Sequence, residues 1–426
     1  MSSGPKRKAS LKVIHKYGPC FQSNEDLVQI PSHTEILLQD QHRVNSIHSR
    51  LSNNSNSNKL WDSQASTIPA KSGLNIGSGS YIVTVGFGTP KRDLRLVFDT
   101  GSDLTWTQCK PCAVCYNQLD PIFDPYKSTS YTNIPCPTPL CSQLTSATGS
   151  PGQCSSSSKC KYLVAYGDGS YTLGYFSKER LTITSSSDVV DNFIFGCGQD
   201  NEGLFNGIAG LLGLGRGQVS IVQQAAQKYG RFFSYCVPST SSSTGYLTFG
   251  KGNGVSKTLK FTPLLVLSQG PSFYGLNLIG ISVGGRRLSI PTSIFSTAGT
   301  IIDSGTVITR LPPMAYHALR TAFRELMRNY PMTSPVSSLL DTCYDLSKSK
   351  SVSVPHISFL FGGDVSLNLD KVGIFYMLSQ SQACLAFAGN GNPRDIAILG
   401  NVQQRGLEVA YDVVGGRIGF RSGGCS

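Results

Sequence analysis

Two short stretches of this sequence carry the residue types that can activate water for hydrolysis, Phe98–Ser102 and Ile302–Thr306. Each stretch consists of an apolar residue, an aspartate, a hydroxyl residue, a glycine and a second hydroxyl residue. One such string is a common turn, but two copies, each after an apolar run, are hard to ascribe to chance. Two carboxylates held face to face share one proton, so one can act as general base on a water and the other as general acid. The sequence therefore predicts Asp99 and Asp303 as a catalytic pair.

The residues after each aspartate are suited to holding this pair in place. The first hydroxyl residue of each copy can hydrogen-bond across to the backbone of the other copy, and the glycine permits a tight turn and close backbone approach. The second hydroxyl residue can donate to the outer carboxylate oxygen, which keeps the two carboxyl groups coplanar. The predicted supporting residues are Thr100, Gly101 and Ser102 in the first copy and Ser304, Gly305 and Thr306 in the second.

Composition indicates the fold class that must position these residues. The chain has 426 residues, of which 39% are hydrophobic and 45 are glycine, and its apolar runs are short. This length exceeds what one core usually holds, and the pattern of short apolar runs between turns is typical of an all-β protein. No apolar run approaches the length of roughly 18 residues that a membrane-spanning helix needs. We therefore expect two β lobes and an extension, without a membrane span.

A weak internal repeat divides the chain. In each half an aliphatic-aliphatic-glycine motif follows the aspartate motif at a distance, at Leu211–Gly213 and at Ile398–Gly400. Two matching lobes related by an approximate two-fold axis would place one aspartate on each side of that axis. We predict an N-terminal lobe over residues 72–262 and a C-terminal lobe over 263–426. Only a few short helices are expected, around 219–229 and 312–330.

The first 71 residues differ from the rest of the chain. A strand is predicted near 11–17 and a helix over 35–51, followed by a Ser/Asn tract typical of a linker. This order indicates a removable prosegment that is cut between about Asn58 and Gly79; the alternative is a disordered tail. Residues 1–8 contain no apolar segment of the kind found in a signal peptide, so we expect the natural chain to begin upstream.

Cysteine usage indicates an oxidising compartment. Twelve of the 13 cysteines lie between Cys109 and Cys425, which suggests six disulfides whose pairing the spacing cannot select. The run Cys109-x-x-Cys112-x-x-Cys115 could instead form a metal or iron–sulfur clip. No histidine or cysteine pair nearby completes such a pattern, and no nucleotide-binding fingerprint is present. We therefore predict neither a metal nor a cofactor.

Two other functions compete for features of this chain. The net charge of +12 could attract nucleic acid, but the positive charges are scattered, which favours a basic soluble surface. The run Gly280–Gly284 matches the Gly-x-Ser-x-Gly nucleophile elbow of serine hydrolases, which requires a helix after the serine. The following Gly284–Arg287 instead predicts a hairpin turn. Only His317 and His356 lie beyond the first 71 residues, so a catalytic base is scarcely available.

Together these motifs resemble those of pepsin-family aspartic proteases, and within them the nepenthesin-like plant group. The resemblance covers about residues 77–426 and implies a bilobal pepsin-like fold with pseudo-two-fold lobes. It implies an endopeptidase that cleaves extended polypeptides at acid pH as a monomer, with its own prosegment as intramolecular inhibitor. The cysteine pattern places it in the apoplast or another secretory compartment, with a plastid or the vacuole as the alternatives. The motifs that carry the resemblance are Phe98–Ser102, Trp106, Tyr166–Ser170, Gly210–Gly213, Asp303–Thr306 and Ile398–Gly400.

The resemblance also assigns roles that the residue pattern alone leaves open. Tyr166 matches the tyrosine of a substrate-covering hairpin (the flap), with Gly167 and Asp168 at its tip, and Trp106 matches the aromatic residue that steadies it. The disulfides implied by the resemblance are Cys109–Cys112, Cys115–Cys197, Cys136–Cys160, Cys141–Cys154, Cys236–Cys425 and Cys343–Cys384.

A non-enzymatic protein on the same fold is the main rival. Related chains that inhibit plant cell-wall enzymes often lack one aspartate or its hydroxyl neighbour. This chain retains Asp99, Asp303 and the hydroxyl residues beside both. The sequence therefore favours the protease over an inhibitor, and over a basic nucleic-acid-binding protein.

Overall fold

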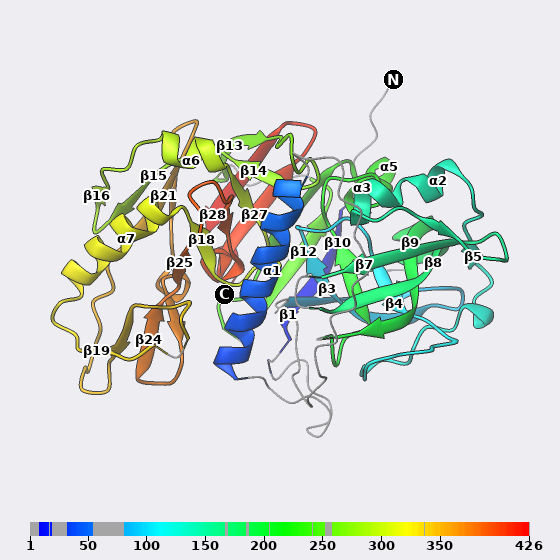
Figure 1. Ribbon diagram of the computed structural model, residues 1–426, viewed down its shortest axis with the longest axis horizontal. Coiled ribbons are helices and arrows are strands. Elements are labelled where there is room, and N and C mark those ends of the chain that lie inside the picture. Colours follow the sequence, from blue (N-terminus) through cyan, green and yellow to red (C-terminus); the bar gives the residue numbers. More distant parts are fainter. Residues whose placement is uncertain are drawn as a thin grey trace.

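The computed structural model describes residues 8–16, 18, 32–53, 81–166, 169–184, 187–203, 205–240, 242–251, 258–335 and 337–425. Figure 1 shows two groups of strands on either side of a single long helix, α1, drawn in blue across the middle of the molecule. The described part is mostly strands with few short helices, so the predicted all-β, bilobal class is confirmed. The first two residues of the predicted linker over 52–58 form the end of α1, and the rest of the linker and the predicted cleavage region up to residue 79 lie outside the described residues.

In the N-terminal lobe, the strand before Asp99 is held by neighbours on both edges. β2 (Tyr81–Phe87) and β3 (Arg92–Asp99) form an antiparallel hairpin. β10 (Gly210–Gly213) lies parallel to β3, with Leu212 opposite Phe98, and antiparallel to β4 (Trp106–Gln108). Asp99 therefore ends a buried strand whose position is fixed from both sides.

The C-terminal lobe repeats this arrangement around Asp303. β17 (Thr300–Ile302) lies parallel to β26 (Ala397–Leu399), which also contacts the antiparallel β18 (Thr309–Leu311). The glycine after each aliphatic pair donates its N–H to an equivalent threonine hydroxyl, Gly213 to Thr105 at 3.1 Å and Gly400 to Thr309 at 3.0 Å. The weak repeat in the sequence is therefore a repeat of structure.

Six strands form a continuous antiparallel sheet that joins the lobes. Phe233 and Tyr411 stack across its centre with ring centroids 4.4 Å apart. The first strand of this sheet comes from the N-terminal segment, which is thus part of the fold and not a separate unit. In order of pairing the strands are β1 (Ala9–His15), β12 (Thr244–Phe249), β11 (Phe232–Cys236), β27 (Leu407–Asp412), β28 (Arg417–Ser422) and β13 (Lys260–Leu265).

The remaining elements surround these strands. In the N-terminal lobe they are η1 (Pro125–Lys127), β5 (Thr132–Asn133), α2 (Pro139–Ser142), α3 (Leu144–Thr148), β6 (Gln153–Cys154), β7 (Cys160–Ala165), β8 (Tyr171–Thr182), β9 (Val189–Glu202), α4 (Ile221–Gln224) and α5 (Ala226–Tyr229). In the C-terminal lobe they are β14 (Tyr274–Leu276), β15 (Leu278–Val283), β16 (Arg286–Arg287), α6 (Ser293–Ala298), α7 (Pro313–Leu326), β19 (Met332–Thr333), β20 (Cys343–Asp345), β21 (Ile357–Phe361), β22 (Val365–Asn368), η2 (Lys371–Gly373), β23 (Phe375–Met377), β24 (Gln382–Leu385), β25 (Phe387–Gly389) and η3 (Asn401–Gln404).

The predicted local elements agree with these bounds with small shifts. The helix expected over 219–229 is present as the two short helices α4 and α5, and α7 ends four residues before the predicted Tyr330. The Gly-x-Ser-x-Gly run lies on β15, and Gly284 and Gly285 form the turn to β16. A turn and β16 follow Ser282 directly, where a nucleophile elbow requires a helix, so this run lies in a hairpin and is not a nucleophile elbow.

The helix α1 (His33–Asn53) buries one face between the lobes. Leu37 packs with Val307 and Ile308, while Val44 and Ile47 pack further along the helix against the C-terminal lobe. Leu37, Val44, Ile47 and Leu51 recur at helical spacing, which is why the sequence predicted a helix here. None of the described helices is long and apolar enough to cross a membrane.

Four of the six expected disulfides are wrong in their pairing. Cys109 bonds to Cys197 and Cys112 to Cys115, in place of Cys109–Cys112 and Cys115–Cys197. The reason is that β4 runs parallel to β9 with Thr107 beside Cys197, which brings the Cα atoms of Cys109 and Cys197 to 5.3 Å. Strand pairing between distant segments is not visible in the local cysteine spacing.

The second correction lies in the Cys-rich insertion. Cys136 bonds to Cys154 and Cys141 to Cys160, in place of Cys136–Cys160 and Cys141–Cys154. All four are neighbours, since Cys154 lies opposite Cys160 in the β6–β7 pair and the sulfurs of Cys136 and Cys141 are 3.7 Å apart. The two pairings close loops of similar length, so chain entropy does not separate them. The pairs Cys236–Cys425 and Cys343–Cys384 are present as expected.

Candidate active site

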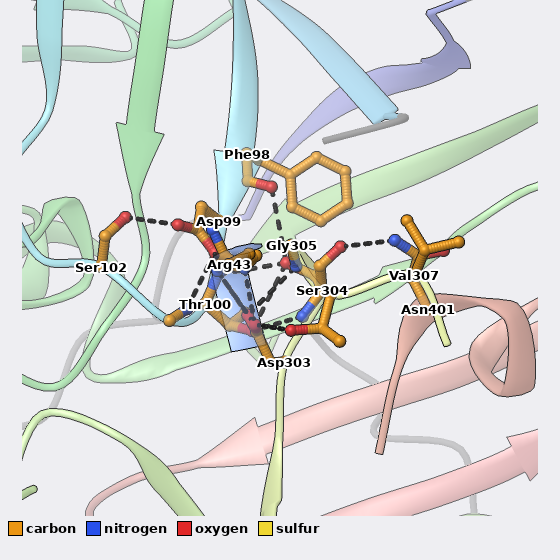
Figure 2. A network of polar contacts seen from close by, with 12 residues as sticks. Arg43, Phe98, Asp99, Thr100, Ser102, Asp303, Ser304, Gly305, Val307 and Asn401 are labelled. Carbon is orange, nitrogen blue, oxygen red and sulfur yellow. Dashed lines mark hydrogen bonds and ion pairs between the residues drawn. The ribbon is translucent and has the colours of Figure 1, made fainter. Parts of the chain in front are cut away.

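Asp99 and Asp303 lie together at the interface of the lobes, one at the end of β3 and the other directly after β17. Both side chains are buried, and one guanidinium, that of Arg43 on α1, contacts both of them. Arg43 Nη2 is 2.6 Å from Asp99 Oδ1 and 3.0 Å from Asp303 Oδ1, and its Nε is 3.0 Å from Asp303 Oδ2 (Figure 2). The structure thus brings the two predicted aspartates to one point.

The outer oxygen of each carboxylate accepts a hydrogen bond from a hydroxyl group. Ser102 Oγ donates to Asp99 Oδ2 at 2.7 Å (Figure 2). Thr306 Oγ1 donates to Asp303 Oδ2 at 2.6 Å. The inner oxygens accept the N–H groups of Gly101 and Gly305 at 3.0 and 3.1 Å. Each carboxylate is therefore fixed in orientation by the turn that follows it.

Thr100 and Ser304 tie the two motifs together across the lobe interface. The N–H of Ser304 donates to Thr100 Oγ1 at 2.9 Å, and the N–H of Thr100 donates to Ser304 Oγ at 3.0 Å. These reciprocal bonds follow the pseudo-two-fold relation, and both side chains are buried. The relative position of the carboxylates therefore depends on the backbone of both lobes.

The two glycines are required by close approach. A Cβ atom on Gly101 would lie 2.7 Å from Asp303 Oδ1, and one on Gly305 would lie 2.6 Å from Asp99 Oδ1. Real Cβ contacts are never this short. Any larger residue would push the carboxylates apart, so glycine is required at both positions.

The protonation of the pair is asymmetric while Arg43 is bound. Burial by itself raises the pKa of a carboxyl, but at Asp99 the Arg43 charge and the Ser102 and Gly101 hydrogen bonds outweigh it and lower the pKa. At Asp303 burial dominates, the charge of Asp99 adds to it, and the pKa is raised despite Arg43. Two adjacent carboxyls with pKa values moved apart are suited to one acid and one base role.

Beyond Arg43, α1 inserts a second charged side chain. Asp40 lies one helical turn before Arg43 and is fully buried against the C-terminal lobe. Its carboxylate accepts the N–H groups of Val307 and Ile308 at 2.6 and 3.0 Å and pairs with Arg310 at 2.9 Å. Asp40 and Arg43 of α1 are thus each paired with groups of opposite charge in the lobes: Asp40 with Arg310, and Arg43 with the two aspartates.

The residues predicted to form the flap are only partly described. Tyr166 follows β7, and its hydroxyl accepts a hydrogen bond from Trp106 Nε1 at 2.8 Å, while Gly167 and Asp168 lie outside the described residues. Phe205 packs edge-on against both rings. A cavity of about 90 Å³ remains between α1 and the N-terminal lobe, with Asp99, Tyr166 and Phe205 in its lining. Tyr166 therefore lines the same cavity as Asp99.

Sequence reasoning missed Asp40 and Arg43. The signal was available, because both charged residues interrupt or adjoin the apolar face formed by Leu37, Val44 and Ile47 on a predicted helix. A charge on a core-facing stripe needs a partner when it is buried. Nothing in the sequence says that the partners are the two aspartates and Arg310.

Among the described residues, no group of three or more histidine, cysteine, aspartate or glutamate side chains is arranged to hold a metal ion. The cysteines of the Cys109–Cys115 run are all in disulfides.

Two buried aspartates on a repeated Asp-hydroxyl-Gly turn, inside two matching β lobes, define the class of pepsin-like aspartic proteases. Comparison with known proteins shows that the chain belongs to this family. The family models for the xylanase inhibitor N-terminal and C-terminal domains match residues 81–251 and 273–422. The chain is 54% identical over 98% of its length to the Arabidopsis thaliana protein named aspartyl protease family protein At5g10770, covering 88% of that protein.

More distant relatives agree on the family and on the fold. Aspartic proteinase nepenthesin-2 of Nepenthes gracilis is 41% identical over 79% of this chain and 76% of its own. Among solved structures, that of edgp superposes with a TM-score of 0.67 at 19% identity, covering 99% of this chain and 96% of that one. Basic 7S globulin from soybean has a TM-score of 0.64 at 21% identity over 82% and 94%. At these identities the two structures establish the fold alone.

Proposed function

We propose that this protein is an aspartic endopeptidase made as a self-blocked precursor. The observation that carries the proposal is the pair Asp99 and Asp303, buried together and oriented by Ser102 and Thr306, with one guanidinium on both. Its relatives named as aspartyl proteases and aspartic proteinases support the activity. The substrate class is an extended polypeptide.

The pair performs hydrolysis once Arg43 has left. Two adjacent carboxyls cannot both ionise easily, so one keeps a proton. The ionised carboxylate takes a proton from a water held between the two, and the water oxygen attacks the scissile carbonyl carbon. The protonated carboxyl donates to the carbonyl oxygen, and a proton then passes to the leaving nitrogen as the C–N bond breaks. Peptide and water yield an acid and an amine.

In this proposal residues 1–71 are the prosegment. The position of α1 supports it, since Arg43 contacts both carboxyl groups and the helix fills the space that a substrate would need. Cleavage within residues 58–79 frees α1 and β1 from the covalent chain. The processed protein would act as a monomer, and its six disulfides suit a secretory or extracellular compartment.

Peptide digestion by the processed protein at mildly acid pH, with and without pepstatin, tests the activity. Asp99→Asn and Asp303→Asn should each abolish cleavage, while Asp364→Asn, a matched change at an exposed turn, should not. Pepstatin-insensitive cleavage, or full activity of either active-site variant, would refute the proposal.

A binding or inhibitor protein on the same fold is the second candidate, since the matching family models are named for xylanase inhibitors. The retained hydroxyl bonds to both carboxylates argue for the protease. Absence of any peptide cleavage would favour the inhibitor.

A further inference from the structure

The C-terminal lobe contains a preformed receptor for a carboxylate next to the catalytic pair. Three groups of this lobe converge on the Asp40 carboxylate: the N–H of Val307, the N–H of Ile308 and the guanidinium of Arg310. All four residues are buried while α1 is in place. Two backbone donors and a guanidinium on one carboxylate form a strong, oriented anion site.

The donors of this receptor all belong to the C-terminal lobe. The backbone N–H groups of Val307 and Ile308 belong to the turn that follows Thr306, and Arg310 lies on β18. Arg310 Nη1 donates to the carbonyl oxygen of Ile308 at 2.8 Å, which holds the guanidinium beside the two N–H groups. From α1 the polar contacts among the described residues are the Asp40 carboxylate and a longer one, 3.4 Å, from Arg310 Nη2 to Gln41 Oε1, while Leu37 packs against Val307 and Ile308.

The guanidinium has donor capacity that α1 leaves unused. Arg310 Nε is buried and has no hydrogen-bond partner among the described residues. The Arg310 side chain is 1% exposed, and Asp40 satisfies only part of its donors. When α1 leaves, the cover over Val307, Ile308 and Arg310 leaves with it, and all three present donors to the open cleft.

We propose that in the processed enzyme Val307, Ile308 and Arg310 form a subsite that selects an acidic side chain of the substrate, aspartate or glutamate. This inference rests on the proposed protease function and adds a specificity to it. Asp40 occupies the subsite in the precursor, so α1 blocks the carboxylate pair with Arg43 and the acidic subsite with Asp40.

The helix geometry places the subsite close to the scissile bond. Asp40 and Arg43 are three residues apart, and a helix rises 1.5 Å per residue, so their Cα atoms are separated by about 4.5 Å along the axis. An extended substrate advances about 3.3 Å per residue. The acidic side chain therefore belongs within one to three residues of the cleaved bond.

The test compares peptides that differ only in glutamate against glutamine at each position within three residues of the bond. At a pH of about 5.5 free glutamate is ionised. The processed protein should then cleave one glutamate peptide with a kcat/KM about tenfold above its glutamine partner, the size expected for hydrogen bonds to a charged group. The preference should disappear below a pH of about 4, where the glutamate of the substrate takes up a proton.

Variants assign the preference to Arg310. Arg310→Met should reduce the glutamate-to-glutamine ratio to about one, and Arg310→Glu should favour the lysine version of the same peptide. Arg287→Met, an exposed arginine on β16, should keep the ratio of the unmodified protein. The pH dependence of the unmodified protein is a readout that needs no variant and so does not depend on how Arg310 variants fold.

The outcomes distinguish failure of the acidic subsite from failure of the proposed protease activity. Equal cleavage of glutamate and glutamine peptides at every position, or a ratio that survives Arg310→Met, overturns the acidic subsite while the protease stands. If neither peptide is cleaved and Asp303→Asn changes nothing, the protease proposal fails and the subsite fails with it.

Discussion

The contact of Arg43 with both carboxylates predicts a large effect of removing this side chain. The Arg43 side chain is only 16% exposed, and its two partners are at most 1% exposed. Removing one partner from a buried ion pair costs about 3–5 kcal/mol. Since the carboxyl pair can take up a proton once the cation is gone, the lower value of about 3 kcal/mol applies, which is about a 150-fold loss in binding.

Inhibition in trans measures this loss directly. A synthetic peptide covering residues 32–53 is added to the processed protein, and its inhibition constant is measured at a pH of about 6 for the natural sequence and for Arg43→Met. The change should raise the inhibition constant about 150-fold. Arg43→Lys keeps the charge but lacks the second nitrogen needed to bridge, so it should fall between the two.

The control is Asn45→Ala. Asn45 is an exposed residue of the same helix, and its side-chain oxygen accepts a hydrogen bond from Gln41 of α1 itself. Alanine favours helix, so this peptide should inhibit at least as well as the natural one. An Arg43→Met peptide that inhibits within fivefold of the natural peptide would refute the reasoning, because the ion pairs would then contribute little to docking.

The pH dependence of the same measurement has a definite sign. Arg43 lowers the pKa of Asp99 in the docked state, so this part of the docking energy is present above the ordinary aspartate pKa, about 3.9, and is lost as the pH falls through the lowered value. The natural peptide should therefore lose affinity at strongly acid pH more steeply than the Arg43→Met peptide does.

Three further predictions follow from single contacts. Burial lowers the pKa of His48 in the docked helix, although the contacts with Ile396 and Asp395 act to raise it. Docking should therefore also weaken as the pH falls below about 6.5. A His48→Gln peptide should not show this loss of affinity when its inhibition constant is measured between about pH 7 and 5. Tyr166→Phe removes the acceptor for Trp106 but keeps the ring, and kcat/KM should fall about fivefold, the value of one neutral hydrogen bond, with little change in the melting temperature. Mass mapping of the unreduced protein should recover a Cys109–Cys197 linkage and no Cys109–Cys112 linkage.

Much of the fold and the central residues of the candidate site could be predicted from local sequence. The helix α1 was predictable because its apolar residues recur at the helical period. The turns at Gly284–Gly285 and after Asp99 and Asp303 were predictable because each contains glycine, which permits tight turns that other residues rarely form. The two carboxylates could be matched to each other because the same five-residue pattern occurs twice. These features depend on residues within one or two turns of chain.

The tertiary structure decided what depends on distant segments. Cys109 bonds to Cys197 because β4 and β9 run side by side, a pairing that no spacing within residues 109–115 encodes. Arg43 and Asp40 were visible as charges beside an apolar stripe, but their partners lie far away in the sequence: 56 residues from Arg43 to Asp99, 260 from Arg43 to Asp303 and 267 from Asp40 to Val307. The sequence alone determined the chemistry of each half of the site. Only the packing of α1 between the lobes determined which charges meet. A buried charge is costly unless it is paired, and the tertiary structure determines which partner lies within reach.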